Sequence, residues 1–182
     1  RNNEVIGYNN YFFERDGETT TVKNQYKFEV KLLSATIFKV EGYGEEIYLE
    51  DNLISFQSKT LQNKKEKFVN LKFDKNSKKF DIEGSSYSGY ASIKNIIGNW
   101  WSHKILQAES QISPISGSIK EQIVTFIGKE NITINGKQYE TDHFKLTSKD
   151  ISLPEDKKLN FDIWLDKKTS VIVKITYERM GN

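Results

Sequence analysis

The sequence predicts a mainly β fold in which one long antiparallel sheet of roughly ten strands curls into a half-barrel or open barrel. A single helical segment near residues 92–106 is expected to pack on the concave face of that sheet. Three observations support this prediction. Apolar and polar residues alternate at the two-residue period of a strand over most of the chain, short polar turns separate these runs, and only residues 92–106 repeat their apolar residues at helical spacing.

The first strands are predicted near the N-terminus. The stretch 5–14 is apolar on both faces and ends in the polar sequence Arg-Asp-Gly-Glu at 15–18, which predicts a strand followed by a turn. Residues 26–32 then alternate apolar with charged and polar side chains, the clearest inside-outside pattern in the chain. One face of this part of the sheet is therefore expected to contact water.

The alternation continues through Phe38 and is interrupted by Gly-Tyr-Gly at 42–44, where a bulge or bend is expected. Further short strands follow, separated by polar turns that include Glu-Asp-Asn at 50–52 and Asp-Lys-Asn-Ser at 74–77. The lysine-rich stretch 59–67 lies between two apolar runs. It is interpreted as a solvent-exposed hairpin loop, with a phosphate-binding site as the alternative.

Residues 92–106 are predicted to form the helix. Their apolar residues fall on one helix face, and Ser92 is a suitable N-cap. Gly98 weakens the helix by about 1 kcal/mol, so the helix is expected to depend on burial of its apolar face. That face consists of Ile93, Ile96, Ile97, Trp100, Trp101 and Ile105.

The C-terminal half is predicted to return to antiparallel strands. The Gly- and Ser-rich residues 84–89 lead into the helix as a loop or, alternatively, a lid, and residues 111–118 are expected to be irregular. Asn135-Gly136 is the dipeptide best suited to a type I′ hairpin turn between two apolar strands. A long hairpin that turns at 166–169 closes the chain.

The composition is typical of a single folded domain spanning residues 1–182. The chain has 182 residues, of which 36% are hydrophobic and 13% aromatic, and these values exclude a disordered or collagen-like chain. Lys and Arg number 27 against 25 Asp and Glu, and the charges are interspersed, so no nucleic-acid partner is expected. Because cysteine is absent, disulfides and zinc-thiolate sites are excluded.

The sequence predicts no transmembrane segment, because no apolar run approaches the roughly 20 residues that a membrane-spanning helix needs. No signal peptide is recognised in it. The chain begins at Arg1 rather than Met, which leaves a removed targeting segment open. Composition alone therefore does not assign a compartment.

Two histidines are candidates for chemistry. His103 follows the two tryptophans and is interpreted as a helix-end residue. His143 lies in a predicted strand and shares one face with Thr141 and Lys145, since neighbours in a strand point to opposite faces. A metal site would need these distant histidines to converge with a carboxylate, so neither a metal nor another cofactor is expected.

Asp162 and Asp166 flank Trp164 on the polar side of one strand. Paired carboxylates serve acid-base chemistry or bind a cation, but an exposed polar face is the simpler interpretation because no basic or nucleophilic partner is indicated. Trp164 on such a face indicates either a second packing layer or an interaction surface. No phosphate loop, Gly-x-Ser-x-Gly elbow or His-Glu-x-x-His motif occurs, so the sequence predicts no catalytic residues.

Four features of the C-terminal half suggest a known family. They are Tyr87 with Asn99-Trp100-Trp101, the Gly136-Lys137-x-Tyr139 turn, the strand 161–166 and a final strand that runs into Gly181. In this order they resemble a family of exported proteobacterial proteins of unknown function, which implies a periplasmic or otherwise exported location. At fold level, a curled antiparallel sheet that closes on a short helical segment is also remotely similar to the periplasmic lipoprotein-carrier fold, whose concave apolar sheet shelters acyl chains.

Two interpretations of function stay open, and an enzyme ranks third. The first is a non-enzymatic binding protein that shelters a lipid or other hydrophobic ligand between the sheet and the helix. The second is a structural or interaction module of the cell envelope with a filled core, which meets a protein partner around Trp164 or at a sheet edge. An enzyme would need a polar cluster in the concavity. The predicted ligand-binding residues are Ile96, Ile97, Trp100 and Trp101 from the helix and Tyr26, Phe28 and Phe38 from the sheet.

Overall fold

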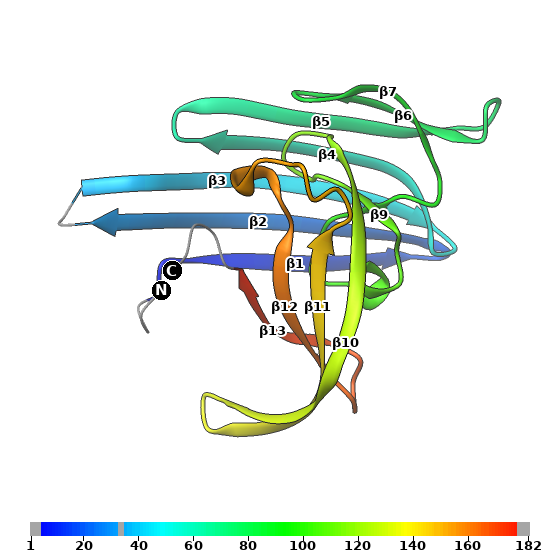
Figure 1. Cartoon of the computed structure of the whole chain (residues 1–182). Helices are drawn as coiled ribbons and strands as arrows, with labels where there is room; N and C mark the ends of the chain where they lie inside the picture. The colour runs from blue at the N-terminus through cyan, green and yellow to red at the C-terminus, as the bar shows by residue number, and fades with distance from the viewer. Residues whose placement is uncertain (1–4, 33–34, 178–182) are drawn as a thin grey trace. The chain divides into compact units, whose positions relative to one another are not determined.

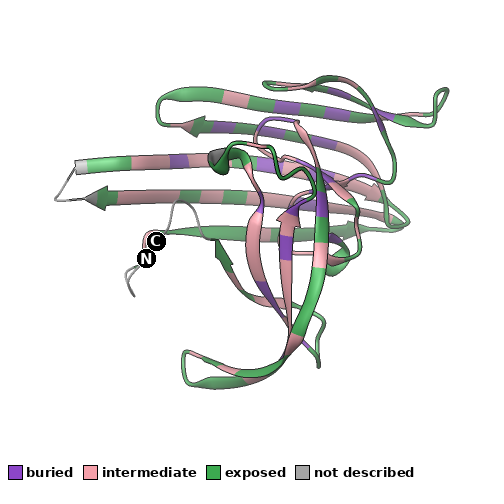
Figure 2. Ribbon diagram, viewed as in Figure 1, coloured by how far each residue is buried: buried purple, intermediate pink, exposed green. Residues whose placement is uncertain are grey.

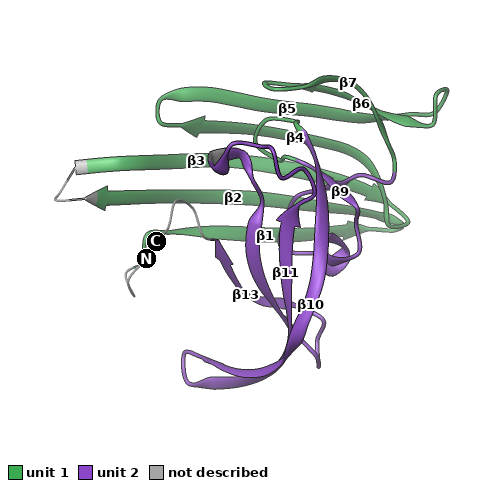
Figure 3. Ribbon diagram, in the orientation of Figure 1, with its two compact units in different colours: residues 1–93, 113–118 green, residues 94–112, 119–182 purple. Residues whose placement is uncertain are grey.

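The computed structural model describes residues 5–32 and 35–177, and the chain divides into two compact units (Figures 1 and 3). Unit 1 comprises Arg1–Ile93 and Ser113–Ser118, and unit 2 comprises Lys94–Ile112 and Ile119–Asn182. Each unit has its own β-sheet. The single curled sheet expected from the sequence is therefore replaced by two sheets, of seven and six strands.

Unit 1 is an antiparallel meander in which seven strands follow one another in chain order. Each strand pairs with the next, which confirms the antiparallel meander predicted for this part of the chain. The strands are β1 (Gly7–Asp16), β2 (Thr19–Leu32), β3 (Ala35–Leu49), β4 (Asn52–Gln62), β5 (Lys65–Asp74), β6 (Lys79–Gly84) and β7 (Ser88–Ser92).

Tight two-residue turns join β3 to β4 and β4 to β5. Glu50 and Asp51 have φ values of 47° and 67°, and Asn63 and Lys64 have values of 47° and 68°. Two consecutive positive φ values are typical of a type I′ turn, whose twist matches that of the paired strands. The predicted turn after β3 is thus confirmed, and the lysine-rich stretch 59–67 forms a hairpin.

One face of the unit 1 sheet carries its buried side chains. Figure 2 shows buried residues separated by more exposed ones along the strands of this sheet. Val22, Val69 and Leu71 are fully buried. Leu71 lies opposite Phe56 on β4 and Ile82 on β6, so three neighbouring strands place apolar side chains on this face. The residues between them along β4, β5 and β6 are mostly exposed, as the two-residue period of a strand requires.

Residues 113–118 belong to unit 1 although they come later in the chain. The Ser58 hydroxyl donates to the Pro114 carbonyl at 2.6 Å, and the Ser86 amide donates to the Ser116 carbonyl at 2.9 Å. A Cβ at Gly84 would lie 2.7 Å from that Ser116 oxygen, so the close approach requires glycine. These contacts hold residues 113–118 against the meander as an irregular segment. The irregular stretch predicted over 111–118 is thus confirmed for 113–118 and wrong for 111–112, which belong to strand β9 (Ser110–Ile112).

Unit 2 contains a six-stranded sheet in the order β13-β12-β11-β10-β9-β8. β8 and β9 are parallel, whereas the other pairs are antiparallel. Asn135 and Gly136, with φ values of 49° and 79°, form the predicted hairpin turn, and the terminal hairpin is also confirmed. The elements are β8 (Ile96–Ile97), the 3₁₀ helix η1 (His103–Leu106), β9 (Ser110–Ile112), β10 (Ile119–Ile134), β11 (Lys137–Ser148), the 3₁₀ helix η2 (Glu155–Lys157), β12 (Asn160–Asp166) and β13 (Ile172–Tyr177).

The core of unit 2 forms where η1 packs on β11 and β12. Ile105, Leu146 and Ile163 are fully buried, and Leu159 is nearly so. Partly buried hydrophobic residues complete this cluster: Ile96, Trp100, Leu106, Val124, Phe161, Ile172 and Ile175. Side chains from a short helix and several strands therefore share one apolar core.

The helix predicted over residues 92–106 does not form. β7 ends at Ser92, Ile96 and Ile97 form a short strand, and only residues 103–106 are helical, as one 3₁₀ turn. The Gly98 amide donates to the Ile112 carbonyl at 2.9 Å, which extends the pairing of β8 with β9. A distant partner strand therefore overrides the local apolar pattern, and Ile93, which the helix would have buried, is 54% exposed.

Three further predictions concern a bulge, membrane-spanning segments and the number of domains. The bulge expected at 42–44 is not observed, and the register of β3 shifts instead beside Val30 and after Ile47. In the described part of the chain, no helix has the length and apolar character needed to cross a membrane. Folding as a single domain stays a prediction, because two compact units are compatible with either one or two folding transitions.

Candidate functional site

Three predicted ligand-binding residues lie on one face of the unit 1 sheet. Tyr26 and Phe28 alternate on β2, and Phe38 on β3 lies opposite Val30. Residues two apart in a strand share a face, and directly opposed residues share it as well. Tyr26, Phe28 and Phe38, here called the aromatic row, therefore project from the same face as the buried Val22, and all three remain partly exposed.

Tyr26 is held in place at one end of the aromatic row. Its hydroxyl lies 2.6 Å from Thr60 Oγ1 on β4. β3 contributes Gly42 between them, where a Cβ would lie 2.7 Å from the Tyr26 hydroxyl, so glycine leaves space for the ring. Burial raises the pKa of Tyr26 above its ordinary value, so the phenol stays protonated at neutral pH.

One buried acid lies farther along the same face. Glu46 on β3 pairs with Val22 and Phe56 and is nearly fully buried. The Tyr48 hydroxyl donates a hydrogen bond to Glu46 Oε2. Burial, together with the nearby Glu46 carboxylate, raises the pKa of Tyr48, so this hydroxyl remains a donor. The aromatic row is thus apolar, whereas a hydrogen-bonded acid follows it toward the turn between β3 and β4.

The other predicted ligand-binding residues belong to unit 2. Ile97 is buried on β8, and Ile96 packs partly buried against the unit 2 core. The Trp100 ring lies 4.8 Å from the Phe161 ring, measured between centroids, and belongs to that same core. Trp101 is partly buried. The structure therefore brings Tyr26, Phe28 and Phe38 together on the sheet of unit 1, and Ile96 and Trp100 together in the core of unit 2.

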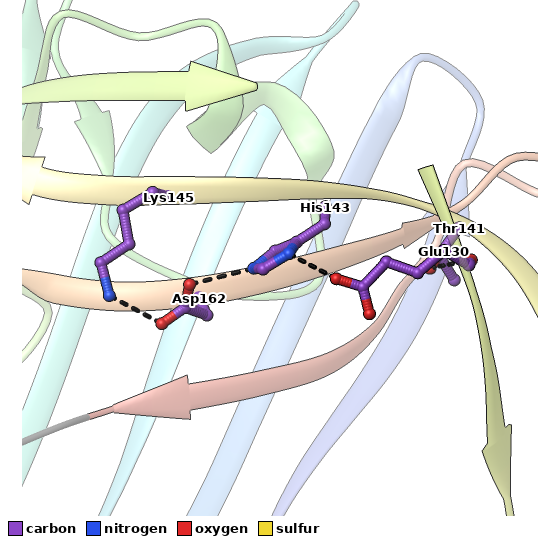
Figure 4. Close-up of polar contacts among 5 residues, drawn as sticks. All are labelled: Glu130, Thr141, His143, Lys145 and Asp162. Carbon is purple, nitrogen blue, oxygen red and sulfur yellow. Dashed lines mark hydrogen bonds and ion pairs between the residues drawn. The ribbon is translucent and has the colours of Figure 1, made fainter. Parts of the chain in front are cut away.

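A polar cluster occupies one face of the unit 2 sheet (Figure 4). His143 on β11 lies between two carboxylates, with Nε2 2.9 Å from Asp162 Oδ1 and Nδ1 2.6 Å from Glu130 Oε1. The first contact is a hydrogen bond, whereas the second is a close contact that is not aligned as one. Lys145 Nζ donates to the other Asp162 oxygen at 2.7 Å. Three strands thus contribute four charged or titratable groups to this cluster.

The Trp164 ring packs against this polar cluster. It stacks on the His143 ring with a centroid separation of 4.4 Å and an interplanar angle of 12°. Lys174 Nζ lies 4.1 Å from the centroid of the Trp164 ring, within range of a cation–π interaction. Trp164 is therefore buried as a second packing layer, and the exposed interaction surface that the sequence allowed around it is not observed.

The electrostatics of the polar cluster centre on Asp162. Partial burial alone would raise the pKa of this carboxyl group, but hydrogen bonds from Lys145 and His143, with their charges, outweigh it and lower the pKa. Asp166 is not part of the cluster, because its carboxylate accepts from the amide and hydroxyl of Thr169 in the following turn. The two aspartates therefore do not act as a pair.

The chemistry available to the polar cluster is limited. Both ring nitrogens of His143 face carboxylates, and the nearby Thr141 hydroxyl donates to the Glu130 carbonyl at 2.8 Å, so it is not placed as a nucleophile beside the histidine. Within the part of the chain that the structure describes, no three His, Asp or Glu side chains converge in the manner of metal ligands. The arrangement is that of a stabilising network across neighbouring strands.

Sequence reasoning identified part of this cluster. Placing His143 and Lys145 on one strand face was correct, but their partners Asp162 and Glu130 were missed. Asp162 could be found only from the register of β11 with β12, which the sequence does not display. Glu130 is placed by the shift of register between Phe126 and Gly128, and no residue in β10 signals that shift.

Comparison with known proteins gives a family but no activity. No curated protein and no solved structure matches the chain. Residues 1–182 match the family described as a domain of unknown function, DUF6134. The match spans both compact units, and the chain therefore belongs to the DUF6134 family.

Proposed function

We propose that this protein is a non-enzymatic, exported binding protein that shelters a hydrophobic ligand, a lipid or an acyl chain, on the aromatic row of unit 1. The observation that carries the proposal is the gathering of Tyr26, Phe28 and Phe38 on one sheet face while all three stay partly exposed. Apolar side chains left in partial contact with water gain free energy when a ligand covers them.

The immediate surroundings of the aromatic row suit an apolar ligand. Val30 and Val40 extend the row on the same face, opposite Phe38 and Phe28 respectively. The only polar group of the row, the Tyr26 hydroxyl, already has a partner in Thr60. A ligand that lies on this face would therefore desolvate carbon atoms without leaving a polar atom of the row unpaired.

The exported location is part of the proposal and is supported by the sequence resemblance to exported proteobacterial proteins. The remote similarity to the lipoprotein-carrier fold supports the same ligand class, since that fold also uses an apolar sheet face. With the predicted helix replaced by short elements of unit 2, the proposed site consists of the sheet residues alone.

Titration with a fluorescent long-chain fatty acid tests the proposed site. Phe28→Ser and Phe38→Ser should each weaken binding about tenfold, because each removes an aromatic side chain worth roughly 1–3 kcal/mol of burial. Tyr43→Ser is the matched control, since Tyr43 lies on β3 but projects from the opposite face. Equal affinity of the wild type and both phenylalanine variants would contradict the proposal.

A cell-envelope interaction module with a filled core is the second candidate. The packing of Trp100 against Phe161 in the unit 2 core favours it, because this tryptophan is then used for stability. In that case Trp100→Ala should lower the free energy of unfolding by roughly 3–5 kcal/mol, and the wild-type protein should bind no fatty acid in the fluorescence titration.

A further inference from the structure

The unit 1 sheet carries a groove on the face opposite the aromatic row. Its volume is about 700 Å³, and it extends over β1 to β5. Most of the lining side chains belong to that face, such as Gln25 and Lys27, which flank Tyr26 on β2. Four residues whose side chains belong to the other face also contribute to the lining: Tyr26, Gly42, Thr60 and Lys67. Neither Phe28 nor Phe38 of the aromatic row belongs to this lining, so the two phenylalanines distinguish the aromatic row from the groove.

Three exposed aromatic side chains lie along the groove. Tyr8 on β1, Tyr43 on β3 and Phe68 on β5 are 49%, 52% and 38% exposed. They occur on every second strand, so their strands are about 9.5 Å apart at the usual spacing of neighbouring strands. Tyr43 and Phe68 lie in one register row, and Tyr8 lies in the next row on that face. Exposed aromatic side chains gathered in a concave region of a sheet surface indicate a surface for stacking.

Charged side chains separate the aromatic ones. Lys59 lies between Tyr43 and Phe68 in the register, directly opposite both. Lys27 lies opposite Tyr8 and pairs with Glu41, with 3.7 Å between its Nζ and the nearest carboxylate oxygen. Stacking faces therefore alternate with hydrogen-bonding groups of both signs across the groove.

We infer that this groove binds a β-linked oligosaccharide. A sugar ring has an apolar C–H face, which stacks on an aromatic ring, and a rim of hydroxyl groups, which bond to Lys and Glu side chains. In an extended β-1,4-linked chain the same ring face recurs at every second unit, and this repeat is comparable to the separation of about 9.5 Å between alternate strands. The alternation of Tyr43, Lys59 and Phe68 thus matches the alternating chemistry of such a chain.

Other ligand classes fit the groove less well. An acyl chain gains most from a continuous apolar surface, and Lys59 interrupts it between Tyr43 and Phe68. A nucleic acid requires an excess of positive charge, whereas this lining holds two glutamates, Glu41 and Glu66, beside its lysines, and Glu41 pairs with Lys27. A largely neutral ligand with both apolar and hydroxyl surfaces is the better complement.

Isothermal titration calorimetry with four tetrasaccharides tests the inference: β-1,4-linked glucose, N-acetylglucosamine and xylose, and α-1,4-linked glucose. At least one β-linked probe should bind, and Tyr43→Ala and Phe68→Ala should each weaken that binding about tenfold. Tyr90→Ala is the matched control, since Tyr90 is an exposed tyrosine on β7 outside the groove lining, and it should leave the affinity unchanged.

The outcomes separate this inference from the proposed function. Phe28→Ser, on the opposite face, should keep wild-type saccharide affinity while losing fatty-acid binding. No binding of any β-linked probe at millimolar concentration, binding of the α-linked probe alone, or unchanged affinity in both groove variants would overturn the inference. Tyr43 and Phe68 are partly exposed, so far-UV circular dichroism of their variants should match that of the wild type.

Discussion

Asp162 is the residue on which the polar cluster of unit 2 depends. Its two carboxylate oxygens accept from His143 and from Lys145, and the carboxylate is mostly shielded from solvent, with its side chain 22% exposed. Loss of the negative charge would leave both donors with a weaker acceptor. The stack of His143 on Trp164 would lose the group that orients the imidazole ring.

Asp162→Asn should lower the free energy of unfolding by about 2 kcal/mol at pH 7, the usual contribution of hydrogen bonds to a charged group. The folded-state pKa of Asp162 is depressed, so its contribution is complete above the unfolded pKa of about 3.9 and is lost as the pH falls through the folded value. Urea denaturation at pH 7 and at pH 3 measures both effects.

Asp81→Asn provides the matched control for this residue, because Asp81 is an exposed carboxylate on β6. Its substitution should change the free energy of unfolding by less than about 0.5 kcal/mol at either pH. The account of the polar cluster would be wrong if Asp162→Asn were as mild as Asp81→Asn, or if the stability difference from wild type grew as the pH fell.

Trp164 illustrates what residue-level reasoning from sequence can and cannot predict. Alternation along β12 correctly placed Trp164 and Asp162 on one side of the strand. That side was interpreted as exposed because its sequence neighbours are polar, whereas His143 and Lys174 from adjacent strands cover the indole ring. His143 and Lys174 reach the ring because of the register between β11, β12 and β13. The alternation within one strand carries no information about that register.

At the scale of elements, the turn between β3 and β4 places two non-glycine residues in the left-handed backbone conformation. Glu50 and Asp51 both adopt positive φ, a conformation that costs a non-glycine residue roughly 1–2 kcal/mol. Asn and Gly adopt positive φ at a lower cost in free energy, and Asn135-Gly136 occupies the equivalent turn between β10 and β11. Replacing Glu50-Asp51 by Asn-Gly should therefore raise the free energy of unfolding by about 1 kcal/mol, as measured by urea denaturation. A lower stability would contradict the assigned turn.

Gly98 distinguishes the observed strand from the predicted helix. In a helix, Gly98→Ala would stabilise the protein by about 1 kcal/mol. In the structure, a Cβ at Gly98 would lie 2.0 Å from Gln111 Oε1, and Gln111 is held by a hydrogen bond of 2.6 Å to Gln122. Gly98→Ala should therefore lower the free energy of unfolding by about 2 kcal/mol.

Gly128→Ala is the control for Gly98→Ala, because a Cβ at Gly128 would meet no atom within 4 Å. Thermal denaturation of the two variants should show a clear loss for the first and a small change for the second. Stabilisation by Gly98→Ala would restore the helical interpretation of residues 92–106.

The elements that the sequence predicted correctly are those defined by local contacts. The first hairpin, the Asn135-Gly136 turn and the terminal hairpin join neighbouring strands, so their signals lie within a few residues. β8 was not predicted. It has only two residues, too few to show the two-residue alternation of a strand, and it pairs in parallel with the distant residues 111 and 112. Short apolar runs are ambiguous between helix and strand, and here the distant partner decided the outcome.

At the scale of the whole molecule, the division into two units changes what the candidate site contains. The sequence combined residues of the sheet with Ile96, Ile97, Trp100 and Trp101 in one pocket. Trp100 belongs to the core of unit 2, whereas Tyr26, Phe28 and Phe38 share a face of unit 1. The central claim that follows is narrower: the aromatic row of unit 1 binds a hydrophobic ligand.

Native mass spectrometry of the protein purified from its source, combined with organic extraction, tests that claim most directly. We expect a stoichiometric lipid or other hydrophobic molecule that is retained by the wild type and by Tyr43→Ser and is lost from Phe28→Ser. A mass without ligand, together with no uptake from a panel of fatty acids and phospholipids, would contradict the claim and leave the interaction module as the supported function.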